Sequence, residues 1–108
     1  MELSEILRMA VDKKASDVLL ITGLPVSLKI DEVIVRLNDK RLTPEQTEAL
    51  VRQIYGLANR MFKILAEQGD DDFSFSVAQL SRFRVNAFRQ RGSYSAVVRA
   101  LSFELPDR

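Results

Sequence analysis

The strongest constraint on the fold is a stretch of alternating apolar and polar residues near the C-terminus, divided in two by Gly92. Its apolar members are Phe83, Val85 and Ala87 before the glycine and Ala96, Val98 and Ala100 after it. A period of two is typical of a strand that is buried on one face, and a glycine between two such runs indicates a hairpin turn. A loop at Arg91 and Gly92 pairs Gln90 with Ser93 and puts all six apolar residues on one face of a hairpin over residues 82–101.

The same register places two arginines directly opposite each other on the other face of the hairpin. Arg84 faces Arg99, and Arg82 is diagonal to Arg99. Like charges in this arrangement are mildly destabilising. A face that tolerates them usually has an anion or a carboxylate nearby; alternatively, the face is only solvated and the two side chains splay apart. No acidic residue occurs between Phe73 and Phe103.

The other elements follow from changes in hydrophobic period. We expect a helix over residues 3–14, a continuous apolar strand over 18–21, a meander of alternating strands over 26–30 and 33–37, and a further alternating strand from 72 to 77. The order is therefore helix, three strands, two helices and three strands, which places the chain in the α+β class. Its 108 residues fit a single domain, 1–108.

The two central helices have recognisable end signals. Thr43 and Gln46 predict an N-cap with a capping box, and Gly56 is expected to end that helix. Asn59 is then expected to cap a second helix that ends at Gly69. The acidic run at residues 70–72 is interpreted as a polar turn and not as a metal site, because no other carboxylate cluster accompanies it.

Composition excludes several classes of function. The chain has no cysteine and no histidine, which excludes a disulfide framework, a thiolate nucleophile, a Ser-His-Asp triad and the usual zinc ligands. We therefore assign no catalytic residue and no metal site. No apolar run is long enough to span a membrane, and we expect a cytoplasmic protein. The net charge of +1 is uneven: residues 1–72 carry 10 basic and 13 acidic side chains, whereas residues 73–108 carry 6 and 2.

Several short motifs, read in order, resemble one known family. They are Ala15-Ser16-Asp17, Gly23-Leu24-Pro25, Asp72-Phe73-Ser74-Phe75, Arg82-Phe83-Arg84-Val85-Asn86-Ala87-Phe88, Gln90-Arg91-Gly92 and Ala96-Val97-Val98-Arg99. Together they are similar to the N-terminal domain of the type IV pilus twitching-motility ATPases of the PilT type, within the secretion-ATPase superfamily. The hairpin motifs carry most of the specificity, and the resemblance covers nearly the whole chain.

The resemblance implies a PAS-like domain, an antiparallel sheet of about six strands with helices packed against it. In the family a RecA-like motor domain follows, and the 108 residues contain none of its motifs, such as GxxxxGK[ST]. The resemblance further implies a hexamer that uses ATP and Mg²⁺ when full-length and works at the inner membrane with the pilus machinery. We expect no hydrolysis, cofactor or nucleic acid for this chain alone.

By motif position, the resemblance implies that Arg84 and Arg99 contact the phosphates of a nucleotide, with Arg82 and Arg91 as secondary candidates. Guanidinium groups suit this role because they stay charged and present a planar fork to phosphate oxygens. Two alternatives remain. A sheet face with Arg82, Arg84 and Phe88 is also compatible with a nucleic-acid-binding module, and a PAS-like domain with a sensory or scaffold role.

Overall fold

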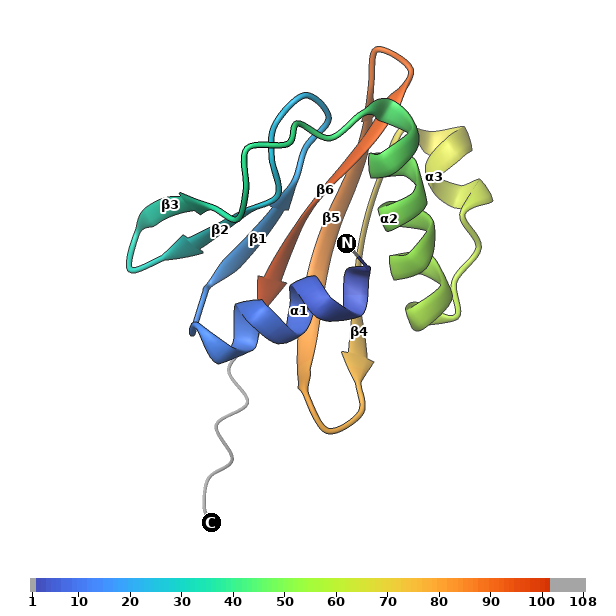
Figure 1. Cartoon of the computed structure of the whole chain (residues 1–108). Coiled ribbons are helices and arrows are strands. Elements are labelled where there is room, and N and C mark those ends of the chain that lie inside the picture. The colour runs from blue at the N-terminus through green and yellow to red at the C-terminus, as the bar shows by residue number, and fades with distance from the viewer. Residues whose placement is uncertain (1, 102–108) are drawn as a thin grey trace.

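The computed structural model describes residues 2–101, which form three helices and six strands (Figure 1). The elements are α1 (Leu3–Asp12), β1 (Asp17–Leu20), β2 (Ser27–Ile30), β3 (Val33–Arg36), α2 (Pro44–Ala58), α3 (Lys63–Gln68), β4 (Asp70–Val77), β5 (Ser81–Gln90) and β6 (Ser93–Ala100). All six strands belong to one antiparallel sheet with the order β3-β2-β1-β6-β5-β4. The predicted element order and the six-stranded antiparallel sheet are thus confirmed.

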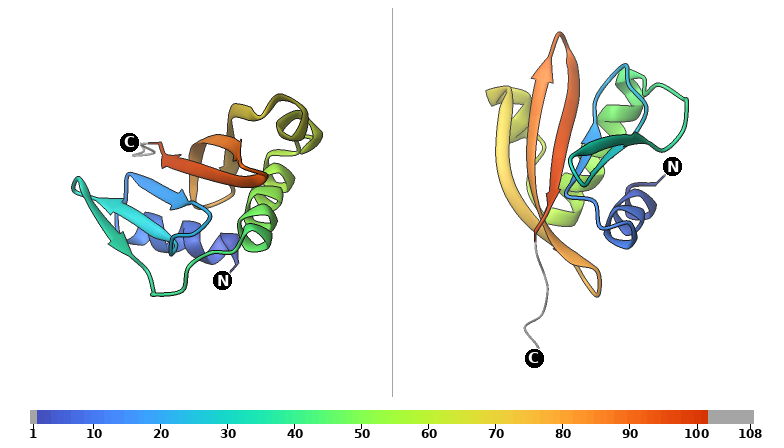
Figure 2. Two further views of the ribbon diagram at one scale, coloured as in Figure 1. Left: turned by 90° about the horizontal axis from the view of Figure 1, so that it is seen from above. Right: turned by 90° about the vertical axis from the view of Figure 1, so that its left-hand side faces the viewer.

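Helices cover one face of this sheet. In the views of Figures 1 and 2, α1 and α2 lie across the same face, and α3 lies beside the β4 edge. The core forms between these helices and the inward-facing strand residues. Its fully buried members include Ile6, Leu7, Val51, Ile54, Leu65, Phe83, Val85 and Val98. None of the helices in residues 2–101 covers the opposite face of β1, β4, β5 and β6, on which Arg82, Arg84 and Arg99 are exposed.

The C-terminal hairpin has the register expected from its alternation. Gln90 pairs with Ser93, and Arg84 pairs with Arg99. Both loop residues, Arg91 and Gly92, have positive φ angles of 54° and 82°. This is the backbone of a two-residue turn whose twist matches the flanking strands, and glycine adopts it at the lowest cost. The inner face is buried as predicted, with Ala100 half-buried at its end.

The helix ends differ from the prediction at three positions, the first being α1, which ends at Asp12 and not at residue 14. The capping box of α2 is present, because Thr43 accepts a hydrogen bond from the backbone of Gln46 and the Gln46 side chain accepts one in return. Gly56, however, lies inside α2, and the helix runs on to Ala58. Asn59 is its left-handed C-cap, with φ 55°, and not the start of the next helix. Asparagine tolerates this conformation because its short polar side chain bonds locally.

The first three strands form the predicted meander, but their burial differs from the prediction. Leu19 and Ile21 are only half-buried, so the apolar run of β1 is not enclosed on both faces. All four residues of β3 are exposed, because β3 is an edge strand that projects with β2 beyond the helices (Figure 1). The Asp31-Glu32 turn between them has positive φ at both residues and no glycine.

The acidic run at residues 70–72 is not a turn. Gly69 ends α3 with φ 85°, as predicted, and β4 begins at the next residue. Asp71 points inward and is buried, whereas Asp70 and Asp72 are exposed. The prediction failed because three consecutive aspartates suggest a loop, whereas in the fold each of them has a pairing partner on β5.

Candidate functional site

The uncovered face of the sheet contains a shallow pocket of about 330 Å³. Its walls come from four neighbouring strands, β1, β6, β5 and β4, in that spatial order. The lining residues are Asp17, Asp72, Arg84, Asn86, Val97 and Arg99. The pocket brings together both arginines singled out from the sequence and adds two carboxylates to them.

Strand pairing alone sets this arrangement. Arg99 on β6 lies between Asp17 on β1 and Arg84 on β5, directly opposite both. Directly opposed residues have Cβ atoms about 4.5 to 5.5 Å apart, so these side chains are immediate neighbours. In the next row, Asn86 lies between Val97 and Asp72. The four charged side chains therefore lie on one patch of the sheet, with both signs represented.

Arg84 is held by Asp72 through two hydrogen bonds. Its Nε atom donates to Oδ1 of Asp72 and its Nη2 atom to Oδ2, each over 3.1 Å. This hydrogen bonding holds the pKa of the Asp72 carboxyl below its ordinary value and raises the pKa of Arg84. Both side chains remain about half exposed or more, at 62% for Arg84 and 49% for Asp72. Exposed ion pairs contribute little to stability, so this pair can exchange for another anion.

Arg99 is more open than Arg84. Its Nε atom lies 3.9 Å from Oδ2 of Asp17, which is ion-pair distance but too long for a hydrogen bond. Within residues 2–101 its guanidinium donates no hydrogen bond, and the side chain is 68% exposed. The carboxylate of Asp17 is only 15% exposed, so it remains beneath Arg99. Arg99 thus presents a full set of donors to an anion.

The secondary candidates lie apart from this pair to different extents. Arg82 precedes Arg84 by two residues on the same face of β5 and lines an adjoining hollow that shares Asp72 and Arg84. Arg91 is at the hairpin tip, seven residues along β5 from Arg84, or about 23 Å at strand rise. The structure therefore groups Arg82 with the arginine pair and separates Arg91 from it.

The two carboxylates of the pocket were not predicted from the sequence. Asp17 lies on β1 and is remote in sequence from its neighbour β6, whereas Asp72 lies on β4, which forms a hairpin with β5 through residues 78–80. The alternation of residues along β4 could have indicated Asp72: if Phe73 and Phe75 face inward, Asp72 faces outward, on the same face as Arg84. Of the two alternatives for the opposed arginines, the structure therefore shows nearby carboxylates and not a face that is only solvated.

A second charged cluster lies on the helix side and is structural. The Asp71 carboxylate accepts hydrogen bonds from the Tyr55 hydroxyl at 2.7 Å, from Arg60 Nε and Nη2 at 2.8 and 2.7 Å, and from the Asp72 backbone at 3.1 Å. The Arg60 guanidinium also lies over the Phe73 ring. Every acceptor position of the carboxylate is filled, so the cluster joins the end of α2 to β4 and offers no site for a ligand.

Two features are absent from residues 2–101. None of the helices there has the length and hydropathy needed to cross a bilayer. The same residues include no group of three or more potential metal-ligating side chains. The pocket chemistry is therefore that of paired arginines with exchangeable carboxylate partners, which suits the binding of a phosphate-bearing molecule.

Comparison with known sequences identifies relatives of this domain. The chain is 32% identical over 106 residues to the type IV pilus ATPase PilU of Pseudomonas aeruginosa, covering 98% of this chain and 27% of PilU. It is 36% identical over 101 residues to the retraction ATPase PilT of the same organism, covering 94% of this chain and 29% of PilT. The chain thus spans less than a third of the length of these relatives. No family model matches it.

Solved structures agree with this result. The pilus retraction motor PilT with bound ADP matches with a TM-score of 0.81 and 40% identity, over 99% of this chain and 31% of the motor. The Legionella pneumophila ATPase DotB matches with a TM-score of 0.74 over 97% of this chain and 30% of that chain; at 23% identity it supports the fold alone. The resemblance to the N-terminal domain of PilT-type pilus ATPases, first indicated by the hairpin motifs, is thereby confirmed.

Proposed function

We propose that this chain is the accessory domain of a pilus-retraction motor ATPase and that Arg84 and Arg99 contact the phosphates of the motor's nucleotide. The observation that carries the proposal is the arginine pair itself, opposed across β5 and β6 on the face without helices. A related motor structure contains bound ADP, which supports a nucleotide as the ligand. The nucleotide is held mainly by a RecA-like motor domain, and this domain contributes positive charge.

The two arginines differ in their present partners, which supports different roles for them at the nucleotide. Arg99 has no hydrogen-bonded partner within residues 2–101 and is ready to donate, whereas Arg84 must exchange Asp72 for phosphate. The remaining edge of the Arg84 guanidinium, Nη1, is not used by Asp72. Phosphate oxygens accept from arginine in the same forked geometry as carboxylate oxygens, so the exchange preserves hydrogen bonds.

Assembly is the second part of the proposal. The motor domain that holds the nucleotide belongs to the same or a neighbouring subunit of a ring of six, at the cytoplasmic side of the inner membrane. A domain that contributes arginines without a phosphate-binding loop binds nucleotide only weakly by itself. We therefore expect its arginines to contribute to ATP hydrolysis only in the assembled full-length protein.

Nucleic acid is a less suitable ligand for this face. Phe88 does lie on the same face as Arg84, but its partner across the sheet is Asp70. Asp17 and Asp72 add further negative charge beside the arginines. A polyanionic backbone that runs along the face meets these carboxylates, whereas a compact phosphate group needs to displace only one.

Substitution in the full-length protein tests the proposal. Arg84→Ala and Arg99→Ala are each expected to lower the ATPase rate by about 10²-fold, as the loss of one positioned donor does elsewhere. Arg36→Ala is the matched control, because Arg36 is an exposed arginine of β3, three strands away from β6 in the sheet order. Wild-type rates in both folded variants would rule out the nucleotide role.

A further inference from the structure

The edge strand β3 exposes apolar side chains at a side of the sheet that has no partner strand. It stands at the end of the sheet order, so within residues 2–101 only β2 pairs with it. Val33, Ile34 and Val35 are 59%, 51% and 39% exposed, and they are half of the six large apolar side chains exposed in that part of the chain. Proteins commonly protect such an edge with a charge, a proline or a bulge, and these three residues provide none of them.

The two-residue turn before β3 determines which backbone groups face the open edge. Both turn residues, 31 and 32, have positive φ, and Ile30 pairs with Val33 across them. The pair that closes such a turn exchanges both backbone hydrogen bonds, and bonded and non-bonded pairs then alternate along the strands. Val33 and Val35 therefore bond to β2, whereas the N–H and C=O groups of Ile34 point outward and can pair with another strand.

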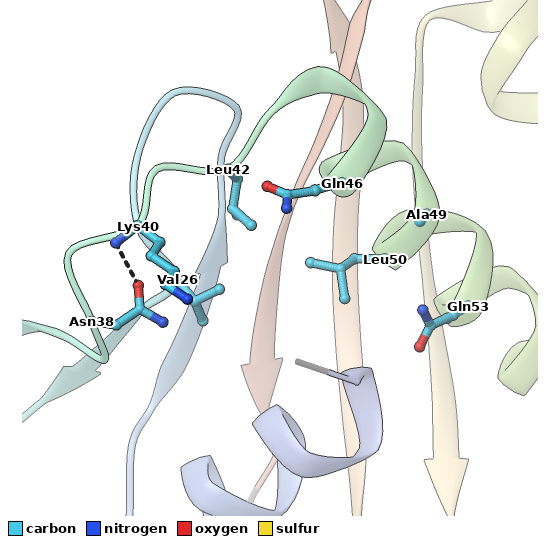
Figure 3. Close-up of a pocket in the computed structure, with 8 residues that line it drawn as sticks. All are labelled: Val26, Asn38, Lys40, Leu42, Gln46, Ala49, Leu50 and Gln53. Atoms are coloured by element: carbon cyan, nitrogen blue, oxygen red, sulfur yellow. Dashed lines mark hydrogen bonds between the residues drawn. The ribbon is translucent and has the colours of Figure 1, made fainter.

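The far end of β3 is also held in place. The backbone N–H of Leu37 donates to the carbonyl of Val26 at 2.9 Å. The segment that follows runs toward α2 beside a pocket of about 200 Å³, and Figure 3 shows Asn38 of this segment, which accepts from the backbone N–H of Lys40 at 2.8 Å. Because β3 is fixed at both ends in an extended conformation, little conformational entropy is lost when a further strand pairs with it.

The sequence of this edge is complementary to itself in the antiparallel direction. Residues 32–36 read Glu-Val-Ile-Val-Arg. When two copies pair around Ile34, each Val33 faces a Val35, and each Glu32 comes to the end of the pair beside an Arg36. Opposed β-branched residues and opposed unlike charges both stabilise a strand pair. A shift of two residues, the smallest that keeps the outward backbone groups facing each other, pairs Ile34 with Arg36 and loses both charge pairs.

The charged groups at the two ends of this segment are available for such a contact. Glu32 is 88% exposed, and its 3.5 Å contact with Lys29 is an exposed ion pair that contributes little. Arg36 is exposed and forms no salt bridge within residues 2–101.

The other edge of the sheet is less suited to a second copy. Strand β4 begins with three aspartates and contains no basic residue, so two copies paired there would bring like charges together. The helix α3 also lies beside this edge (Figure 2). The two edges thus differ in charge and in accessibility, and only β3 is self-complementary.

We propose that two copies of this chain associate through β3, paired antiparallel around Ile34, so that their sheets become continuous. Both copies use the same surface, and each has one β3 edge, so the assembly stops at a dimer. This contact differs from the head-to-tail contacts that build a ring. It is independent of the arginine pair and requires neither a nucleotide nor a motor domain.

Sedimentation equilibrium of the 108-residue chain tests the proposal. A contact through one short strand belongs to the small, weak class of interfaces, so we expect a monomer–dimer equilibrium with a dissociation constant of about 0.1 mM. Ile34→Pro removes the central outward N–H and leaves the bonds to β2 in place, and it is expected to weaken association at least about 10-fold. A monomer at all concentrations up to about 1 mM, species larger than a dimer, or undiminished association of a folded Ile34→Pro protein would overturn the proposal.

Two charge reversals test the register. Arg36→Glu and Glu32→Arg each place like charges at both ends of the pair and are expected to weaken self-association at least about 10-fold. In a mixture of the two variants every opposed charge pair is again unlike, so a mixed dimer with nearly wild-type affinity is expected. Arg8→Glu makes the same charge change on the exposed side of α1 and is the control. Undiminished association of either single variant, or no recovery in the mixture, would equally overturn the assignment.

Discussion

Removal of the Asp71 carboxylate is expected to cost a large part of the stability of this domain. Its side chain is 6% exposed and accepts from both Tyr55 and Arg60. Loss of one partner of a buried ion pair typically costs about 3–5 kcal/mol. Arg60 is 34% exposed and regains water, so Asp71→Ala should fall near the lower limit, at about 3 kcal/mol.

Urea unfolding followed by circular dichroism measures this effect. With a slope of about 1–3 kcal/mol per molar urea for a small domain, the midpoint should fall by about 1–3 M. Tyr55→Phe is the matched comparison, because it removes one neutral donor and leaves the Arg60 pair intact. Its expected cost is about 1.5–3 kcal/mol, because the lost hydrogen bond is to a charged acceptor.

The double variant provides the sharper test. In the Asp71→Ala background the Tyr55 hydroxyl is buried without its acceptor, so the addition of Tyr55→Phe should recover about 1 kcal/mol instead of losing another. Strictly additive effects, or a cost below about 1 kcal/mol for Asp71→Ala, would show that the cluster does not clamp α2 to β4.

The same cluster predicts the direction of the pH dependence. Hydrogen bonding to Arg60 lowers the pKa of Asp71 from its ordinary value of 3.8, and burial raises the pKa of Tyr55 above 10.0. The Asp71 contribution is therefore complete above pH 4 and disappears as the pH falls through its folded-state pKa. The Tyr55 contribution is complete below pH 10 and declines at higher pH. The urea midpoint, measured across this pH range, should fall toward both the acid and the alkaline ends. In Asp71→Ala the decrease at the acid end should be smaller.

Three further predictions concern single positions. Asp72→Asn removes the charge that competes for Arg84 and is expected to raise pyrophosphate affinity by a few fold in a salt-dependent NMR titration; unchanged affinity would argue against the exchange. Glu32→Gly should stabilise the β2–β3 turn by about 1 kcal/mol in urea unfolding, because Glu32 has φ 68°; destabilisation would contradict this. Thr43→Ala should cost about 1 kcal/mol through loss of the α2 cap, and no change in thermal midpoint would refute that role.

Local signals in the sequence were sufficient for the hairpin and for the start of α2. Alternation on both sides of Gly92 allows only one register that buries its apolar residues, so the pairing of Arg84 with Arg99 was predictable. The capping box of Thr43 and Gln46 is equally local, because its two partners are three residues apart. The order of helices and strands followed from changes of period.

The ends of elements were less predictable because tertiary context decides them. Asn59 and Gly56 are both compatible with a helix end, and α2 continues past Gly56 to Ala58, which places Arg60, just after the cap, against Asp71. The acidic run at residues 70–72 has poor strand propensity, yet it forms β4 because the buried Asp71 has the Arg60 guanidinium and the Tyr55 hydroxyl as partners.

The sequence by itself therefore determined that Arg84 and Arg99 share a face, since a hairpin relates its strands through a short turn. Only the tertiary structure decided that Asp17 lies beside them, because β1 reaches β6 by long-range pairing, whereas Asp72 arrives through the β4–β5 hairpin, whose turn at residues 78–80 carries no glycine to mark it.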